Sequence, residues 1–397
     1  MLIQVHLTVT GHATFALLRY CVWLLFLGSL GFYVSAFIAG FRFRRRPEAE
    51  EHPVEFAPNV SVLKPVHGTD FASAENFASF CEQNYPNYEI LFAASDEFDP
   101  AVPLIQRLIT AYPQRRIRLV TGAPFLGENR KVNSLALMVR EAAYEIVAIS
   151  DGDVRVGPDY LRQVVAPFAS NETGAVTCLY RGIAQKNFFA ELEALGAATD
   201  FAAGVIVAER TEGLNFALGA SIVTTKSRIQ CIGGLEPIAQ VLADDYELGR
   251  RIADAGGDVV LSREVVTTMY PAQSLRGFWD HQLRWARTVR LCRPISYMGL
   301  IFTHGFPWAI LAAFFAHTPI AAALYVGAYV LLRLAMAFTV GVGVLEDETV
   351  RRRWWMIPLR DAIQFVVWLA SFASNRVTWG DAQFIMKDGQ MVPVRNS

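Results

Sequence analysis

Long runs without charge lie at both ends of the chain, separated by a segment of mixed polarity. The first covers residues 20–41, and a helix needs roughly 20 apolar residues to cross a bilayer core. This run is followed, in place of a small-residue cleavage site, by Arg42, Arg44, Arg45 and Arg46. The pattern predicts an uncleaved transmembrane anchor, and the positive-inside rule places the chain after residue 42 in the cytosol, with the N-terminus outside.

Apolar character returns after residue 294. Residues 297–316 contain no Asp, Glu, Lys or Arg, and residues 320–345 contain only Arg333, so the two runs predict a membrane hairpin. An arginine inside a span is costly, and we expect it to be paired or functional. Residues 357–375 predict a further span, provided that the charges of Arg360 and Asp361 lie near one end of it.

Between these membrane segments, short β-rich runs alternate with helical patterns. The expected strands cover residues 60–63, 89–94, 117–120 and 145–150, and the expected helices cover residues 71–82, 102–112 and 130–144. This alternation predicts βαβ units, an α/β fold and a mostly parallel sheet. We therefore expect an N-terminal anchor with its basic flank over 1–46, a cytosolic domain over 47–294 that begins with an acidic linker, and a membrane region over 295–397.

Composition supports this division and removes one class of partner. Of the 397 residues, 53% are hydrophobic and 18% charged, and the net charge of −1 provides no basic field to attract nucleic acid. The five cysteines are an odd number, widely spaced and without a CxxC pair, so we expect them to be reduced and buried. The basic run at 351–353 falls on the same side as the first one, which is consistent with a cytosolic domain.

Two acidic pairs are the sharpest candidates for chemistry. Asp151 and Asp153 flank Gly152 at the end of an apolar run, where parallel strands open into the ligand crevice of α/β sheets. Two carboxylates at this spacing suit Mg²⁺, which takes one or two carboxylates plus substrate phosphates, although a solvated turn has the same pattern. Asp244 and Asp245 open an amphipathic helix, where acids also serve as ordinary caps.

The remaining candidates are basic, polar or aromatic. Arg284 and Trp285, preceded by His281, lie in a helical stretch over 274–291 that leads into the membrane. They could bind a diphosphate and a sugar or apolar surface, or only anchor the helix among anionic lipids. Strand ends and the start of a helix supply the others, Lys64, Asp96, Lys131 and Asn133, of which the last two could meet a phosphate.

Taken in chain order, these features resemble glycosyltransferase family 21, the ceramide glucosyltransferase family, whose catalytic domain has the GT-A fold. Residues 61–70, SVLKPVHGTD, resemble the opening block of that family, and residues 84–89, NYPNYE, resemble its second block. The resemblance covers residues 60–285 and has membrane segments where the family has them. It implies a UDP-sugar donor, a membrane lipid acceptor and an inverting displacement.

Roles for individual residues follow from the same resemblance. Asp96 would contact the uridine, while Lys64, Lys131, Asn133 and Asp151 would bind the donor. Asp151 and Asp153 would hold Mg²⁺ or Mn²⁺ with the diphosphate. Asp245 would be the general base, with Asp244 as its acidic neighbour, and Arg284 and Trp285 would complete the (Q/R)xxRW motif of the family.

Two positions depart from the family pattern. The Gln or Arg position of the motif is His281, and Thr199 replaces a histidine that animal members carry between residues 195 and 201. The acceptor therefore stays open between ceramide, glucosylated from UDP-glucose, and a hopanoid polyol, which bacterial members modify from UDP-N-acetylglucosamine. A bacterial inner membrane is the expected location. The sequence also allows a processive polysaccharide synthase or a non-catalytic membrane binding protein.

Overall fold

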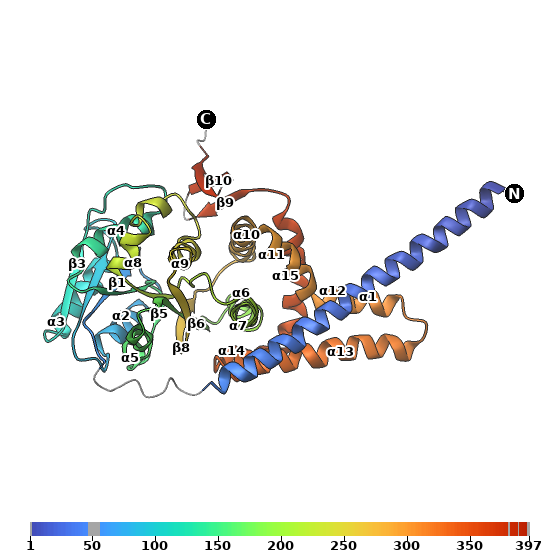
Figure 1. Ribbon diagram of the computed structural model, residues 1–397, viewed down its shortest axis with the longest axis horizontal. Helices are drawn as coiled ribbons and strands as arrows, with labels where there is room; N and C mark the ends of the chain where they lie inside the picture. The colour runs from blue at the N-terminus through green and yellow to red at the C-terminus, as the bar shows by residue number, and fades with distance from the viewer. Residues whose placement is uncertain (1, 47–55, 380–381, 388, 395–397) are drawn as a thin grey trace.

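The computed structural model describes residues 2–46, 56–379, 382–387 and 389–394. Figure 1 shows an α/β domain from which one long helix projects, with a helical hairpin beside part of its length. Most of the expected acidic linker lies outside the described residues. The expected order of anchor, α/β domain and C-terminal apolar helices is confirmed.

An eight-stranded mixed sheet forms the centre of the α/β domain, with the order β3-β2-β1-β4-β7-β6-β8-β5. Its strands are β1 Val60–Pro65, β2 Tyr88–Ala93, β3 Arg116–Val120, β4 Ile146–Ser150, β5 Val154–Arg155, β6 Thr173–Ala184, β7 Ser221–Thr225 and β8 Asp258–Tyr270. Strands β3, β2, β1 and β4 pair in parallel, as do β6 and β8, whereas β7 is antiparallel to both of its neighbours. The four strands predicted from sequence are confirmed, and they form the parallel half of the sheet.

Successive side chains along each strand point to opposite faces of the sheet, and helices cover both faces. Leu63 and Ile149 pack with Val132 of α4, whereas Val62 and Ala148 join the cluster that covers the other face. The helices are α2 Ser73–Cys81, α3 Ala101–Ala111, α4 Arg130–Glu141, α5 Tyr160–Val165, α6 Phe188–Gly196, α7 Ala202–Glu212, α8 Lys226–Cys231, α9 Asp244–Asp254 and α10 Leu275–Cys292. A π-helical turn, Ala197–Phe201, joins α6 to α7.

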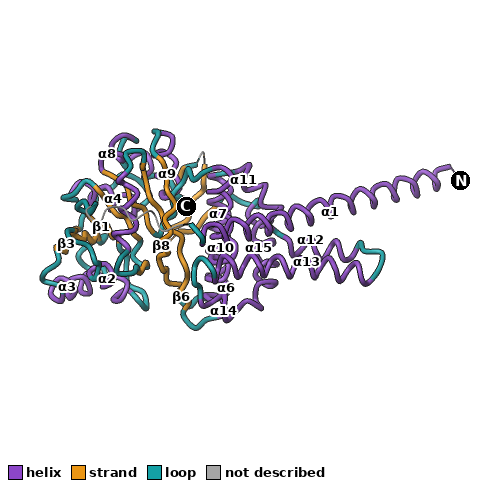
Figure 2. Tube along the Cα trace, turned by 60° about the horizontal axis from the view of Figure 1, so that its bottom comes forward, coloured by secondary structure: helices purple, strands orange, loops and turns teal. Residues whose placement is uncertain are grey.

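Two helices among the described residues are long and apolar enough to cross a membrane on their own. They are residues 14–44 of α1 (Leu2–Arg44) and residues 319–342, which comprise α13 (Pro319–Ala337) and a π-helical turn. In Figures 1 and 2 the N-terminal part of α1 extends beyond the hairpin of α12 and α13. The segments expected to form the anchor and the second arm of the hairpin are thus helices of sufficient length and apolar character to span a membrane.

The first arm of the hairpin is broken instead of straight. Helix α11, Pro294–Gly299, continues into a 3-10 turn, Leu300–Thr303, which meets α12, Gly305–Phe314, at a bend of 49°. Tyr33 of α1 holds the break, because its hydroxyl donates to the carbonyl of Thr303 and accepts from the amide of Gly305. This pair forms a broken span or a re-entrant loop, so the described residues contain up to three spans.

Helix α15, Ile357–Ser371, does not form the further span expected over 357–375. It has 15 residues, fewer than the roughly 20 that a bilayer core requires, and it packs along α10 of the α/β domain. The short helix α14, Glu348–Arg353, precedes α15. Arg360 and Asp361 of α15 are buried inside the protein. Each of the two charged side chains therefore has a partner elsewhere in the fold, and neither lies at the end of a span.

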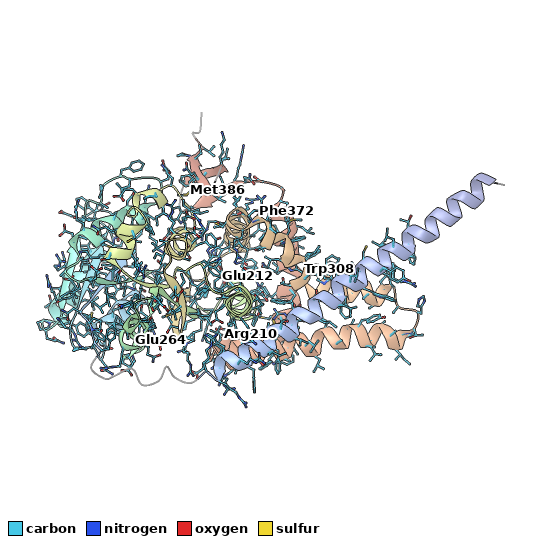
Figure 3. All side chains as sticks on the ribbon, viewed as in Figure 1. Arg210, Glu212, Glu264, Trp308, Phe372 and Met386 are labelled. Atoms are coloured by element: carbon cyan, nitrogen blue, oxygen red, sulfur yellow. The ribbon has the colours of Figure 1, made fainter. Side chains whose placement is uncertain are left out.

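A small C-terminal sheet was not expected. Its antiparallel strands are β9 Arg376–Trp379, β10 Ala382–Lys387 and β11 Gln390–Pro393. Figure 3 labels Met386 on this sheet, beside the end of the domain where α9 lies. The cysteines also differ in part from expectation, since all five are free but Cys21 and Cys231 are exposed.

Candidate active site

The DxD turn and the buried end of β1 lie against one another. Lys64 is fully buried, and its Nζ donates to the backbone carbonyl of Asp151 at 2.7 Å. The same ammonium group lies 3.9 Å from the centre of the Phe80 ring. Burial lowers the pKa of Lys64 to about 7, while Asp153 and Asp151 act in the opposite direction. The first strand therefore places a cation directly behind the acidic turn.

Asp153 is the more buried of the two acids in this turn. Its Oδ2 accepts a hydrogen bond of 2.8 Å from the hydroxyl of Thr268 on β8. Burial and the nearby charge of Asp151 raise the pKa of Asp153 to about 6. Two carboxylates in a poorly solvated site attract a compensating cation.

Lys131, in the first turn of α4, joins the two acidic pairs. Its Nζ lies 2.7 Å from Oδ1 of Asp151 and 3.3 Å from Oδ2 of Asp244. Burial opposes the charge of this lysine, but Asp151, Asp244 and Asp245 together raise its pKa above the ordinary value. Asn129 caps α4 and also donates to Oδ1 of Asp244. Segments that are distant in sequence thus meet at a single cation.

Asp244 and Asp245 have different surroundings, as adjacent helical residues must. Asp244 faces Lys131 and Asn129, whereas Asp245 faces Gly219. A Cβ atom added to Gly219 would lie 2.9 Å from Oδ2 of Asp245 and 3.6 Å from Oδ2 of Asp151. The glycine therefore leaves open the space between these two carboxylates. Burial and Asp244 raise the pKa of Asp245 to about 6, so this acid is suited to proton transfer near neutral pH.

The arginine of the RW pair has no protein partner among the described residues. No hydrogen bond or ion pair engages the guanidinium of Arg284 there, and burial lowers its pKa from the ordinary value, with Glu193 acting against this effect. The adjacent Trp285 is 40% exposed. Its ring meets Phe201 edge to face at 5.9 Å, and Phe201 packs on Tyr180 of β6 at 5.3 Å.

Tyr180 connects this aromatic group to the acids. Burial raises its pKa well above the ordinary value, and the charges of Asp245, Asp153 and Glu193 contribute in the same direction. Figure 1 shows α9, α10 and the helices α6 and α7 end-on in the α/β domain. The RW pair lies on α10, which packs against α6.

Two of the expected donor-binding residues lie less directly at this cluster. Asp96 is exposed, and its Oδ1 accepts from the amide of Phe98 within its own turn. Asn133 is buried, accepts from the amide of Leu126 and donates to the carbonyl of Gly127, so it holds the loop before α4. Their contact with a donor stays a prediction, as do the other assigned roles.

Glu193 and Arg360 are polar side chains near the RW pair that sequence reasoning missed. Glu193 lies in α6 and contacts His281, and Arg360 of α15 reaches Gln282. Each has a second charged residue close by in its own helix, Glu191 for Glu193 and Asp361 for Arg360, so the local sequence does not mark it as buried. Only the long-range packing of α6, α10 and α15 shows that they are buried.

The acidic turn fits a divalent cation that also binds phosphate. No group of three or more His, Cys, Asp or Glu side chains that could hold a metal occurs in the described part of the chain. Mg²⁺ needs only one or two carboxylates when substrate phosphates supply other ligands. Asp151 and Asp153 provide hard oxygen ligands, and burial together with the charge of Asp151 raises the pKa of Asp153.

Comparison with known proteins connects this geometry to one family. Residues 22–392 match the model of glycosyl transferase family 21. Ceramide glucosyltransferase 1 of Caenorhabditis elegans is 27% identical over 256 residues, which cover 64% of this chain and 55% of that protein. The ceramide glucosyltransferase of Candida albicans is 30% identical over 164 residues, covering 35% of this chain and 30% of the relative. The chain thus spans about half the length of the C. elegans relative.

A solved structure supports the fold. A mannosyltransferase from Pyrobaculum calidifontis, in complex with GDP-Man and Mn²⁺, matches with a TM-score of 0.54 and 18% sequence identity. The match covers 90% of this chain and 98% of that one. At this identity the match establishes the shared architecture, and the chemistry must be argued from the residues of this chain.

Proposed function

The chain belongs to glycosyltransferase family 21, and we propose that it transfers a hexose from a UDP-sugar to a hydroxyl group of a membrane lipid, with inversion at the anomeric carbon. The observation that carries this proposal is the contact of Lys131 with both acidic pairs. This contact places the acidic turn, which is suited to bind a metal ion and a diphosphate, next to the buried acid Asp245. The pKa of Asp245, about 6, suits a general base.

The chain supplies positive groups for the donor. Lys64 and Lys131 lie beside the acidic turn, and the guanidinium of Arg284 has no partner among the described residues, which leaves it free to form paired hydrogen bonds with phosphate oxygens. Asp151 and Asp153 would hold Mg²⁺ or Mn²⁺, which when bound neutralises charge on the diphosphate. Asp96 is the proposed contact for the uridine.

In the transfer, Asp245 accepts the proton of the lipid hydroxyl as its oxygen bonds to the anomeric carbon. The bond from that carbon to the diphosphate oxygen breaks, and UDP leaves with the electron pair. Asp244 remains paired with Lys131 and keeps this cation next to Asp245. General base assistance of this kind is typically worth about 10²- to 10⁴-fold in rate.

The fold favours an acceptor that lies in a membrane. Helix α10, which carries the RW pair, leads directly into α11 and the broken arm that follows. With only up to three spans in the described residues, the chain offers little material for a polymer channel, which disfavours a polysaccharide synthase. We propose ceramide with UDP-glucose as the leading pair, and a hopanoid polyol with UDP-N-acetylglucosamine as the second candidate.

Thr199 bears on the choice between these acceptors. It is fully buried in the π-helical turn, where its hydroxyl donates to the carbonyl of Leu195 and accepts from Arg333 of α13. This side chain is thus engaged within the protein and does not offer an acceptor the imidazole that animal members carry there. We therefore propose that the acceptor pocket differs here from that of the animal members, which keeps the hopanoid polyol as the second candidate.

We place the catalytic domain on the cytosolic face of the membrane, in a bacterial inner membrane. The proposal is supported by the basic runs at the ends of two membrane segments. Arg46, after α1, pairs with Glu209 of α7, and Arg353 pairs with Glu191 of α6. Both runs therefore lie beside the catalytic domain, on one side of the membrane helices, as the positive-inside rule requires.

The test is the release of UDP by the full chain in lipid nanodiscs. UDP should be released from UDP-glucose or UDP-N-acetylglucosamine only when a lipid alcohol and Mg²⁺ or Mn²⁺ are both present. EDTA and Asp153→Ala should each reduce the rate by about 100-fold or more, because the diphosphate then leaves without its counter-charge. Unchanged release under chelation would contradict the assigned metal role.

A further inference from the structure

A line of hydrogen bonds runs from the exposed indole of the RW pair into the protein. The Nε1–H of Trp285 donates to Nε2 of His281 at 3.0 Å, and Nδ1 of His281 contacts Oε1 of Glu193. Because Nε2 accepts, the ring proton must be on Nδ1, where it is donated to the carboxylate. The arrangement thus specifies one neutral tautomer of His281.

Glu193 is a buried carboxylate that accepts from several neutral donors. Gln282 donates to its Oε1 at 3.3 Å, and Gln273 donates to its Oε2. Burial by itself would raise the pKa of Glu193, but the bonds from His281 and Gln273 and the charge of Arg360 lower it below the ordinary value. The carboxylate therefore stays ionised and fixed, which makes it a firm acceptor for the proton on His281.

The buried end of this line of hydrogen bonds, at Glu193, is connected to α15 through Gln282. Arg360 donates from Nη1 to Oε1 of Gln282 at 2.8 Å. Gly196, three residues after Glu193 on α6, allows this approach, since an added Cβ would collide with the guanidinium of Arg360. The carboxylate of Glu193 is thus set by side chains from α10, the loop before it, and α15.

We propose that Glu193 and His281 are positioning residues, which hold the Trp285 indole in the orientation that the transfer requires. The proposal rests on the proposed function, in which the RW pair borders the site where donor and acceptor meet. An indole with 40% exposure and edge contacts with the rings of Phe201 and His281 would otherwise turn about its side-chain bonds. The hydrogen bond to His281 removes that freedom before substrate binds.

Hydrogen-bond chemistry at residue 281 makes the proposal specific. A glutamine can accept from the indole through its carbonyl oxygen and donate its amide to Glu193, as His281 does. An arginine can pair with Glu193 but has no acceptor for the indole N–H. His281→Gln should therefore retain turnover, whereas His281→Arg and His281→Leu should lose it, even though arginine also occurs at this position in the family.

The experiment measures kcat and KM for the UDP-sugar with the full chain in nanodiscs. Glu193→Ala, His281→Leu and Trp285→Phe, which retains the ring but lacks the N–H, should each lower kcat by roughly tenfold or more, as expected for a hydrogen bond to a charged or buried partner. The KM for the donor should change by less than about threefold, since the donor contacts are not removed. Arg276→Ala is the matched control, because its side chain is 93% exposed on the same helix.

Two further results separate positioning from a merely structural role. The kcat of the double variant Glu193→Ala/Trp285→Phe should be no lower than that of the more damaged single variant, because both changes break the same line of hydrogen bonds. In protein labelled with 5-fluorotryptophan, the ¹⁹F resonance of Trp285 should shift in His281→Leu and also in Glu193→Ala, which keeps the His281 ring next to the indole, but not in the control.

Additive losses in the double variant, or wild-type rates in Glu193→Ala and His281→Leu, would overturn the inference while leaving transfer itself intact. An absence of transfer by the wild type would overturn the proposed function, and with it any role of this line in turnover. An unshifted Trp285 resonance in His281→Leu would show that the hydrogen bond does not orient the indole.

Discussion

At the scale of single residues, the division of roles between Asp244 and Asp245 is the part of the site most open to test. Asp245→Asn should lower turnover by about 10²- to 10⁴-fold with little change in donor binding, since the base is lost and the diphosphate contacts remain. Asp244→Asn should be milder, because Lys131 keeps its contact with Asp151. Steady-state kinetics with both variants provides the measurement. Greater damage from Asp244→Asn would reverse the assignment within the pair.

The raised pKa of Asp245 predicts how turnover depends on pH. A general base works in its ionised form, so turnover at saturating Mg²⁺ should fall as the pH falls through about 6. The residual turnover of Asp245→Asn should lack this acid limb. A pH–rate profile for both proteins tests the claim, and an unchanged acid limb in the variant would assign the titration to another group.

The same pKa shift predicts a gain in stability when the base is removed. Because the folded-state pKa is raised from 3.8 to about 6, the folded protein binds the proton more tightly than the unfolded chain does. Ionised Asp245 therefore opposes folding at all pH values above about 6, an effect on the order of 1–3 kcal/mol. Without ligand and at pH 7.5, Asp245→Asn should show a higher Tm than the wild type. A lower Tm would mean that the carboxylate is a structural group.

Local sequence patterns mark the proposed reacting groups more clearly than they mark the polar groups around them. Asp151, Asp153 and Asp245 are recognisable because they follow an apolar strand or open an amphipathic helix, and both places are local in sequence. Glu193 is not recognisable, since its burial depends on α10 and α15. Arg333 was expected to be paired, but its partners, Asp361 and Asp200, lie in separate segments that no local pattern connects.

At the scale of secondary-structure elements, the C-terminal sheet supports the segment that enters α9. Leu242 packs with Val377, Phe384, Met386 and Met391, and the amide of Met391 donates to the carbonyl of Gln240. Gln240 in turn accepts from the amide of Glu128 in the loop before α4. This sheet therefore fixes the loop before α9, which positions Asp244, and the loop before α4, which positions Lys131.

This arrangement predicts a functional effect of a distant core substitution. Phe384→Ala removes a ring that contacts Leu242, at a typical cost of about 3–5 kcal/mol, and should loosen residues 239–245. Amide exchange in that segment should rise and turnover should fall. Ile385→Ala is the matched control, since the side chain of Ile385 lies on the same strand and is 39% exposed. Equal effects of both substitutions would contradict the support role.

The elements that sequence reasoning missed share physical causes. Strands β9 to β11 have only four to six residues each and mix polar with apolar positions, so they lack the apolar run that marked β1 or β4. The bend at residue 304 results from a hydrogen bond of Gly305 to Tyr33, which lies 272 residues away. Helix α15 is apolar enough to suggest a span, but its buried Arg360 and Asp361 find their hydrogen-bond partners only through tertiary contacts.

At the scale of the whole molecule, the proposed orientation in the membrane rests on the two basic runs. Thr349→Cys, placed between α13 and the arginines at 351–353, should react with a membrane-impermeant thiol reagent only in inside-out vesicles. The exposed Cys21 and Cys231 should first be replaced by serine, so that the signal comes from residue 349. Labelling in right-side-out vesicles would show that the hairpin or the anchor is oriented the other way.

The central claim is that the molecule joins a UDP-sugar site to a lipid acceptor held at the membrane, and one measurement tests it most directly. The full chain is incubated with radiolabelled UDP-glucose or UDP-N-acetylglucosamine and with ceramide, a hopanoid polyol or a water-soluble oligosaccharide, and the label is partitioned into organic solvent. We predict organic-extractable label that requires a lipid alcohol and disappears in Asp245→Asn, with UDP-glucose and ceramide as the leading pair. Label found only in a growing water-soluble polymer, or no transfer to any lipid alcohol, would contradict the account.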